Sequence, residues 1–237
     1  MRNIINKLLG VFQLFVFALN YLKPKSFDEI KFLNKFLPSN SIIFDIGANV
    51  GTYSKTLDSF VKKEKLNFYL FEPNPKLIKT LSSKRFKHTN NVSIIDSAVA
   101  QSESEEIFYE RNISSYSSLK KDNLTENHKI IDEYSVKTIP IDLFCKKNDI
   151  SKINLLKIDT EGNDFEVLKS ASNMFEKNAV EIIKVEILPS TKSFYEILNY
   201  LEKFKFQLIG ITNLSYLNNK ILLFDAYFVH NQKLNNV

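Results

Sequence analysis

Two carboxylates, Asp159 and Glu161, follow an apolar run and flank the approach to a glycine, Gly162. In an open parallel sheet, ligands bind beyond the carboxyl ends of the strands, so side chains at such a point are placed to do chemistry. Carboxylates there can contact a substrate, remove a proton as a general base, or hold a divalent cation. Lys157, two residues before Asp159, would share its strand face and orient it or lower its pKa. The alternative is that the carboxylates only cap the next helix.

A second informative segment is the glycine-containing turn in Phe44–Gly51. Gly47 and Gly51 allow the backbone to turn sharply and to approach a ligand closely. A dinucleotide fingerprint needs a third glycine that is absent here, and Asp45 would repel a phosphate but attract an ammonium or sulfonium group. The pattern therefore indicates a cofactor with a nucleoside, a cationic centre and an amino-acid tail, as in S-adenosyl-L-methionine. The candidate contacts of this turn are Asp45, Gly47, Asn49 and Gly51.

A third acidic residue, Glu72, ends another mostly apolar run, and Pro73 then stops the strand. It comes one strand-helix-strand unit after Asp45, where a carboxylate can accept hydrogen bonds from ribose hydroxyls. Asp96 follows the next strand and is placed to accept from the amino group of adenine. The plain alternatives are a solvated side chain for Glu72 and a turn residue for Asp96.

Three residues are candidates for binding the substrate. Ser118 lies in the long polar loop Asn112–Asn127, which we interpret as a lid or an acceptor-binding loop; disorder is the alternative. Glu186 ends an apolar strand, and His230 ends the last one, where it is the only histidine expected near the cleft. The histidines show neither zinc-ligand nor Ser-His-Asp spacing.

Four motifs of this chain resemble those of the FkbM-type methyltransferases, and the resemblance runs from about Ser41 to His230. It implies a class I methyltransferase fold, S-adenosyl-L-methionine as cofactor, and O-methylation of sugars, glycolipids or polyketides. One departure is Ser170, which replaces the usual glycine at an expected helix end. The motifs are Phe44–Gly51, Phe71–Pro75, Val136–Leu143 and Leu155–Gly162.

The elements that must position these residues alternate between strand and helix, which is typical of a parallel sheet covered by helices. We therefore expect an α/β, Rossmann-like fold with a mostly parallel seven-stranded sheet and helices on both faces. The expected strands are Ile42–Ile46, Phe68–Phe71, Val92–Ile95, Ile153–Ile158, Val180–Ile187, Gln207–Ile211 and Ile221–Val229, and Ile107–Tyr109 and Ser135–Ile139 also look extended. The expected helices are Thr52–Lys62, Pro75–Phe86, Ile141–Lys147, Phe165–Phe175 and Phe194–Phe204.

The domain boundary falls near Pro38, with an N-terminal helical extension over residues 1–38 and one methyltransferase domain over residues 39–237. A helix capped by Ser26 or Asp28 should run to Leu37. Before it, Leu8–Leu19 resembles a signal-peptide core without a cleavage site and is too short to span a membrane. This segment can dock on the domain, lie at a membrane surface through residues 1–22, or span a membrane. Docking on the domain is the favoured interpretation.

Composition narrows the class of partner. The net charge of +5 is dispersed, which suits attraction of an anionic sugar nucleotide, lipid phosphate or glycan. No zinc-ligand spacing or aromatic RNA-binding signature is present, so nucleic acid is not an expected partner. The single cysteine, Cys145, cannot form an internal disulfide and is expected to be buried. We expect a cytoplasmic protein, with the inner membrane face as an option, and the sequence does not fix the oligomeric state.

The leading hypothesis is thus an S-adenosyl-L-methionine-dependent O-methyltransferase acting on a glycan, glycolipid or small-molecule acceptor, with or without a divalent metal. One alternative is a nicotinamide-dependent sugar oxidoreductase or epimerase; the missing glycine counts against it, as does Asn199 where a Tyr-x-x-x-Lys pair from Tyr195 would need lysine. Another is a catalytically silent fold that docks at membranes through residues 1–22.

Overall fold

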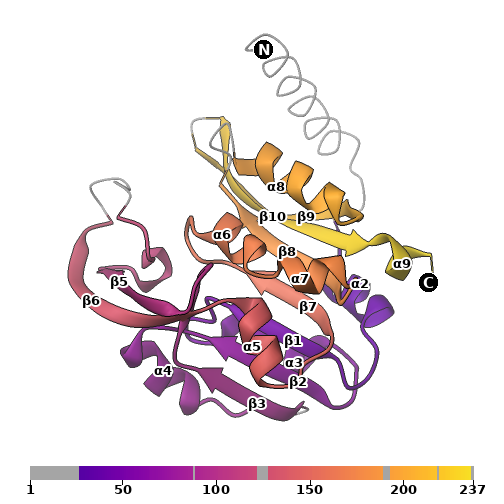
Figure 1. The fold of residues 1–237 in the computed structure, drawn as a ribbon, viewed down its shortest axis with the longest axis horizontal. Coiled ribbons are helices and arrows are strands. Elements are labelled where there is room, and N and C mark those ends of the chain that lie inside the picture. The colour runs from indigo at the N-terminus through magenta and orange to yellow at the C-terminus, as the bar shows by residue number, and fades with distance from the viewer. Residues whose placement is uncertain (1–26, 88, 122–127, 189–192, 218, 236–237) are drawn as a thin grey trace.

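The computed structural model describes residues 27–87, 89–121, 128–188, 193–217 and 219–235. These form a seven-stranded sheet in the order β3-β2-β1-β7-β8-β10-β9, crossed at one end by a smaller sheet (Figure 1). The strands of the large sheet are β1 (Ile42–Ile46), β2 (Leu66–Phe71), β3 (Thr89–Ile95), β7 (Ile153–Ile158), β8 (Val180–Ile187), β9 (Phe206–Leu217) and β10 (Lys220–His230).

Five neighbouring strands, β3-β2-β1-β7-β8, run parallel, whereas β10 is antiparallel to both β8 and β9. The expectation of a mostly parallel seven-stranded sheet is confirmed. All six residues of β7 are buried, as expected for a central strand covered on both faces. The parallel strands therefore end at one edge, which gathers Glu72, Asp159 and Glu186 near each other along the sheet.

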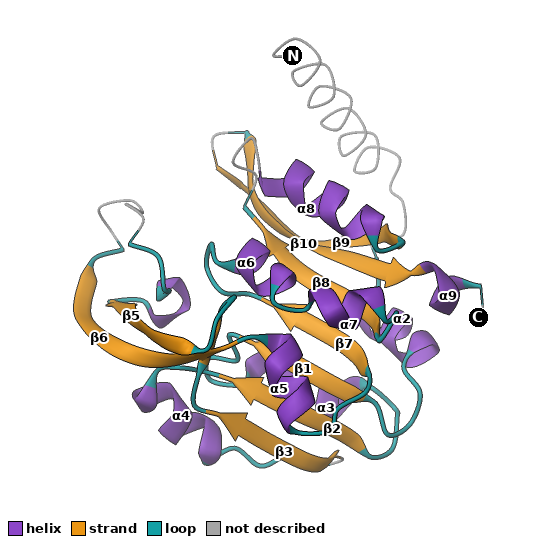
Figure 2. Ribbon diagram, in the orientation of Figure 1, coloured by secondary structure: helices purple, strands orange, loops and turns teal. Residues whose placement is uncertain are grey.

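Helices cover both faces of the sheet (Figure 2). Successive residues of a strand point to opposite faces, so Ile43 joins one apolar cluster while Phe44 and Ile46 join the other. The first cluster lies under α2 (Glu29–Phe36), α3 (Thr52–Phe60) and α4 (Pro75–Ser82). The second lies under α5 (Ile141–Lys147), α6 (Asp164–Lys169), α7 (Ser172–Glu176) and α8 (Ser193–Lys203). Cys145 of α5 is buried, as expected.

One predicted helix is wrong. The segment Phe165–Phe175 forms two helices, α6 and α7, with a break at Ser170 and Ala171. The cause is α5: its first amides donate to the carbonyl of Ser170 at 2.9 Å and to its hydroxyl at 3.2 Å. In return, Asp142 of α5 accepts from the amides of Asn173 and Met174 at the start of α7. Ser170 does end a helix, as expected.

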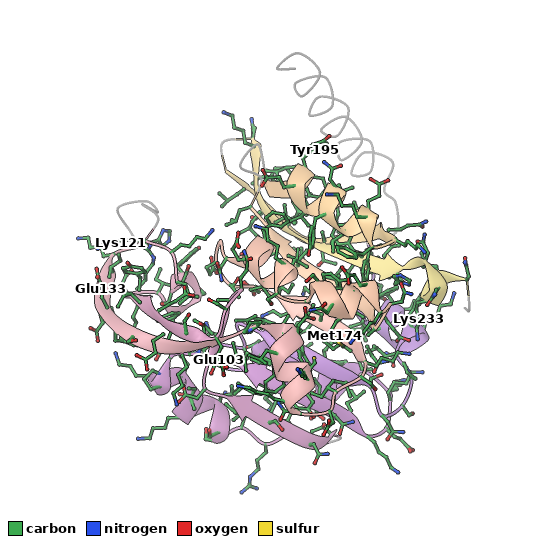
Figure 3. The ribbon with its side chains drawn as sticks, viewed as in Figure 1. Glu103, Lys121, Glu133, Met174, Tyr195 and Lys233 are labelled. Carbon is green, nitrogen blue, oxygen red and sulfur yellow. The ribbon has the colours of Figure 1, made fainter. Side chains whose placement is uncertain are left out.

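The segment between β3 and α5 forms a second sheet, in the order β4-β6-β5, that the sequence pattern did not predict. Its strands are β4 (Ala98–Val99), β5 (Ser104–Arg111) and β6 (Ile130–Ile139), and a short 3-10 helix, η1 (Ser114–Tyr116), follows β5. Lys121 and Glu133 pair at 3.1 Å on its outer side (Figure 3). Of the expected polar loop, residues 112–121 are described, and Ser118 and Leu119 in this part pack against the small sheet.

Helix α2 packs onto the domain. Its Leu33 is fully buried, and Leu37 just after it is nearly so. Glu29 accepts a hydrogen bond from the hydroxyl of Tyr227 in β10, and the ring of Phe27 lies where a side chain at Gly210 would stand. The predicted extension thus belongs to the packed unit where it is described, whereas the apolar segment Leu8–Leu19 lies outside the described residues. Within the described ranges, no helix is long and apolar enough to cross a membrane.

The packing of α2 gives a stability test. Replacing Leu33 with alanine removes fully buried methyl groups, so we expect the free energy of unfolding to fall by about 2 to 4 kcal/mol. Chemical denaturation of the two proteins measures the difference. Lys31→Ala, on the exposed side of the same helix, should change stability by less than about 0.5 kcal/mol. Equal stability of Leu33→Ala and the wild type would mean that α2 does not dock as described.

Candidate active site

The turn after β1 brings the chain close to the end of β7. Gly47 and Gly51 have φ values of +73° and +77°, which are accessible to glycine at little cost. A Cβ on Gly47 would lie 1.9 Å from the backbone oxygen of Asp159, so only glycine fits there. The amides of Gly47 and Ala48 both donate to the carbonyl of Phe71, at 3.1 and 3.0 Å. The turn is therefore fixed against both neighbouring strands.

A buried lysine joins the two strand ends. The ammonium of Lys157 lies 3.0 Å from Asp45 Oδ1 and 3.4 Å from Asp159 Oδ2, and it donates to the carbonyl of Gly47 at 2.9 Å. Burial alone would lower the pKa of Lys157, but the carboxylates of Asp45 and Asp159 outweigh it and raise that pKa above its ordinary value. Lys157 is thus a cation that orients Asp159 and the glycine turn.

The expectation that Asp45 faces a ligand is wrong. Its side chain is fully buried, accepts from the hydroxyl of Ser54 at 2.6 Å, and pairs with Lys157. Asp45 alternates with Phe44 along β1 and therefore points toward α3, behind the cavity. Its cationic partner belongs to the protein. Gly51 also lies outside the cavity and packs against Leu81.

Glu72 stands at the end of β2 with its carboxylate in a fixed position. Its two oxygens accept the backbone amides of Asn49 at 2.8 Å and Asn74 at 2.9 Å. Asn49 itself has a left-handed φ of +51°, which turns its amide toward Glu72. Burial raises the pKa of Glu72 to about 7, against the lowering effect of these two amides. The carboxylate lines the cavity with lone pairs still to be filled.

The turn after β7 presents the predicted acidic pair. Glu161 has a left-handed φ of +53°, unusual for a residue with a side chain. The amides of Thr160 and Gly162, which flank Glu161, donate to the buried carboxylate of Asp164 at 2.8 and 3.1 Å. These two bonds maintain the turn. Burial, Asp159 and Asp164 raise the pKa of Glu161 to about 8. Asp159 is more open, with 40% of its side chain exposed.

Glu186, at the end of β8, joins this pair from the side. Carboxylate oxygens of Asp159, Glu161 and Glu186 all lie within 4.8 Å of one another. Burial and the neighbouring carboxylates raise the pKa of Glu186 to about 9. An oxygen-only set of this kind can hold a hard divalent cation. It also gathers three acidic groups at one end of the site.

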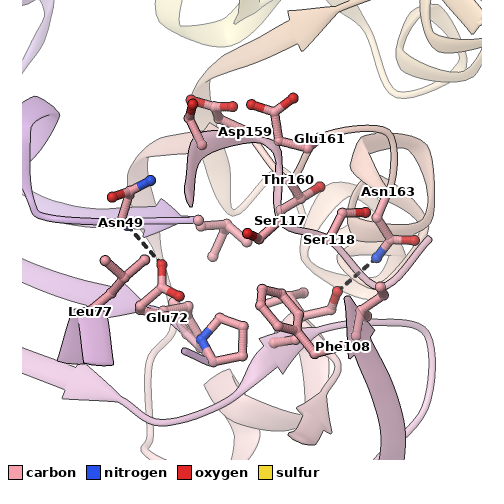
Figure 4. A pocket seen from close by; sticks show the side chains of 18 of the residues that line it. Asn49, Glu72, Leu77, Phe108, Ser117, Ser118, Asp159, Thr160, Glu161 and Asn163 are labelled. Atoms are coloured by element: carbon pink, nitrogen blue, oxygen red, sulfur yellow. Dashed lines mark hydrogen bonds between the residues drawn. The ribbon is translucent and has the colours of Figure 1, made fainter. Parts of the chain in front are cut away.

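A cavity of about 650 Å³, a volume that includes its open mouth, borders Glu72, Asp159 and Glu161 (Figure 4), whereas Glu186 is not part of its described lining. Asn49 and Glu72 lie on one side, Asp159 and Glu161 at one end, and Ser117 and Ser118 on the far side. Its described lining contains three carboxylates and no Lys, Arg or His. Such a cavity favours a ligand that is neutral or positively charged where it meets these side chains.

Two predicted residues lie elsewhere. Asp96 is exposed just past β3, and its neighbour Ser97 lines the cavity instead. His230 lies at the opposite edge of the sheet, because β10 runs antiparallel and its end pairs with the start of β8. There its ring accepts from the amide of Gln232 at 3.3 Å. The expectation that His230 lies in the cleft is wrong.

Sequence reasoning missed three contributors. Asn163 donates to the carbonyl of Val99 at 3.1 Å and so ties the turn after β7 to the small sheet. Asp164 was visible only as an acidic helix start, and its clamp on two amides depends on the turn. Phe108 lines the cavity because β5 folds back over the cavity. No local sequence pattern predicts this position.

Comparison with known proteins identifies the family of the chain. The family model described as "Methyltransferase FkbM domain" matches residues 45–208. The hexuronic acid methyltransferase AglP of Haloferax volcanii is 26% identical over 162 residues, which cover 68% of this chain and 61% of AglP. The chain therefore spans about three fifths of that relative's length.

Among solved structures, the crystal structure of methyltransferase FkbM from Methylobacillus flagellatus KT aligns with a TM-score of 0.51 at 16% identity. The alignment covers 80% of this chain and 44% of that one, and it shows the shared fold alone. The expected class I methyltransferase fold is confirmed. Because the family model spans well over half of its residues, including the turn after β1, Glu72 and the Asp159–Gly162 turn, this chain belongs to the FkbM methyltransferase family.

Proposed function

We propose that this chain is an S-adenosyl-L-methionine-dependent methyltransferase that methylates a hydroxyl group of a sugar, glycan or glycolipid precursor. One observation carries the proposal: the fixed carboxylate of Glu72 and the pair Asp159 and Glu161 open into the same cavity. The membership of the family supports methyl transfer, and the name of the relative, a hexuronic acid methyltransferase, supports a sugar acceptor.

The residues present fit the cofactor. Glu72 is already bonded to two amides, and its remaining lone pairs face the cavity, where they can accept two adjacent ribose hydroxyls. The carboxylates of Asp159 and Glu161 favour a sulfonium centre nearby, a positive charge that S-adenosylhomocysteine lacks. When bound, S-adenosyl-L-methionine supplies an electrophilic methyl group. Gly47 and Asn49 of the turn after β1 line the same cavity.

The acidic turn fits the acceptor. A sugar hydroxyl is a very weak acid, so attack on a methyl group is helped by a base that accepts its proton. Asp159 is exposed to the cavity, and Lys157 behind it orients the carboxylate. In our proposal Asp159 accepts the proton, and Glu161 and Glu186 bind other hydroxyls of the acceptor. Because the reaction is a displacement, most of the remaining catalysis is alignment of the two partners.

The cofactor class is tested by thermal melting. S-adenosylhomocysteine at about 100 times its dissociation constant should add roughly 2.7 kcal/mol, which raises the melting temperature by on the order of 5 to 10 °C. NAD at the same concentration should leave it unchanged, because the turn after β1 lacks the third glycine of a dinucleotide site. A higher melting temperature with NAD alone would instead support an oxidoreductase. An unchanged melting temperature with both ligands would contradict the proposal.

The pKa of Glu72 predicts a pH dependence of cofactor binding. Burial raises that pKa to about 7, and ribose hydroxyls donate best to the ionised carboxylate. The affinity for S-adenosylhomocysteine should therefore increase by about tenfold as the pH rises through this value, and level off above it. Isothermal titration calorimetry at several pH values measures it. Glu72→Gln should bind more weakly with no such rise; an unchanged pH dependence in this variant would exclude Glu72 as the source.

The role of Asp159 is tested by separating turnover from binding. We expect Asp159→Asn to lower kcat by about 100-fold or more, while the dissociation constant of S-adenosylhomocysteine changes by less than about threefold. Transfer of a labelled methyl group to a panel of neutral hexosides and hexuronides measures the rate. Glu202→Gln, on the exposed side of α8, is the matched control. A full rate in Asp159→Asn would contradict the role.

The same assay separates a base from a cation ligand. If Asp159 acts as the base alone, transfer by the wild type continues after the protein is dialysed against EDTA. A loss that Mg²⁺ or Mn²⁺ restores would assign Asp159, Glu161 and Glu186 to a cation instead.

A further inference from the structure

A row of polar side chains crosses four strands of the large sheet, on the face covered by α2 and α3. Residues paired in register on neighbouring strands point to the same face of a sheet. Lys157 of β7 is paired in this way with Lys184 of β8, and both lysines are buried. The row is completed by Asp45 of β1, beside Lys157, and by Tyr227 of β10, beside Lys184. Two buried ammonium groups therefore lie on adjacent strands, where their like charges repel each other.

Each lysine has its own pair of carboxylates. Lys157 lies between Asp45 and Asp159. The ammonium of Lys184 lies 3.0 Å from Asp225 Oδ2 and 3.5 Å from Glu29 Oε1. Asp225 belongs to β10 and Glu29 to α2, and both lie outside residues 45–208, which the family model matches. The second ion cluster is therefore a feature of this chain beyond the matched segment.

One aromatic ring borders both ammonium groups. Tyr53 stands in the first turn of α3, two residues after Gly51. The centroid of its ring is 4.3 Å from the Nζ atom of Lys184 and 5.9 Å from that of Lys157. The face of an aromatic ring attracts a cation, so the ring favours both positions. Tyr53 is not in the described lining of the cavity, so any effect on the site acts through its neighbours.

The pairing of the two lysines matters for the reaction. A lysine side chain is long and flexible, and the row offers carboxylates on either side of the ring. Without the ring, Lys184 is free to turn toward Asp45 and to compete there with Lys157. Displacement of Lys157 would leave Asp159 without the cation that orients it.

We propose that Tyr53 is a positioning residue whose ring keeps the two ammonium groups apart and so directs Lys157 to Asp159. This inference rests on the proposed function, in which Asp159 accepts the proton of the acceptor. It also gives α2 and β10 a part in the site, because their carboxylates hold Lys184 on the far side of Tyr53.

The test combines substitutions at the ring and at the competing lysine. We expect Tyr53→Leu to lower kcat by about tenfold, because a small misplacement of a catalytic group is costly. The KM of the acceptor and the dissociation constant of S-adenosylhomocysteine should each change by less than about threefold. Tyr53→Phe keeps the ring and should retain at least about a third of the wild-type kcat. Transfer of a labelled methyl group measures these rates.

The decisive variant is Tyr53→Leu combined with Lys184→Gln. Glutamine removes the competing charge but keeps a donor for Asp225. We expect the double variant to recover kcat to within about threefold of the wild type, as a non-additive effect of two neighbouring residues. A ring that only stabilises the fold predicts the opposite, namely a double variant at least as slow as Tyr53→Leu. That result, or a full rate in Tyr53→Leu, would overturn the proposal. If Tyr53→Leu does not fold, Tyr53→Met replaces it in both proteins.

A crystal structure of Tyr53→Leu decides the geometry without turnover. We expect the ammonium of Lys157 to lie beyond the ion-pair limit of about 4 Å from Asp159. Contacts of Lys157 identical to those of the wild type would overturn the positioning role. Failure of the wild type to transfer a methyl group to any acceptor would contradict the proposed function instead, and the crystal structure would still show whether the ring places Lys157.

Discussion

The buried ammonium of Lys157 is the contact on which the site depends. It lies between Asp45 of β1 and Asp159 just past β7, and it also holds the carbonyl of Gly47. A buried charge is costly unless it is paired and hydrogen-bonded, and here the ion-pair and hydrogen-bond partners are carboxylates and carbonyls. Removing the lysine would leave Asp45 as an uncompensated charge in the core. The side chain of Lys157 thereby links the packing of the central strands to the orientation of the Asp159 carboxylate.

The remaining carboxylates of the site are buried in a way that disfavours their ionised form. Glu72, Glu161 and Glu186 all have pKa values raised by burial, to about 7, 8 and 9. For such groups the contribution to stability is full below the ordinary carboxyl pKa and is lost as the pH rises toward the raised values. The protein thus keeps acidic groups where the fold alone would favour neutral ones. A ligand with a positive charge or with several hydroxyl donors lowers the free energy needed to ionise these buried carboxylates. Their raised pKa values are therefore linked to the kind of ligand that the site binds.

The sequence predicted the large sheet well for a physical reason. Its central strands are buried apolar runs, β1 ending at Gly47 and β7 at the polar turn Asp159–Gly162, so both were predicted with their observed bounds. What failed depended on contacts far apart in the chain. Ser170 breaks a helix only because α5 starts against it, and His230 leaves the cleft only because β10 reverses direction. Asp45 points to the face of β1 that packs against α3 and not to the cavity. The sequence of a single strand does not show which of its faces borders a ligand.

The small sheet is the clearest limit of the sequence pattern. Parts of β5 and β6 were recognised as extended segments and β4 was not, and the pairing of β5 with β6 brings Phe108, Ser118 and Leu119 over the ends of β1 and β2. The regular order of strand, turn and helix in the large sheet has no counterpart here, since β5 and β6 are joined through a long polar segment. A wall built by such pairing is visible only in three dimensions.

The most direct measurement is a crystal structure of the protein with S-adenosylhomocysteine. We expect the ribose hydroxyls on Glu72 and the sulfur directed toward Asp159. A ligand bound elsewhere, or one bound in this cavity with its ribose away from Glu72, would contradict the assignment of the site.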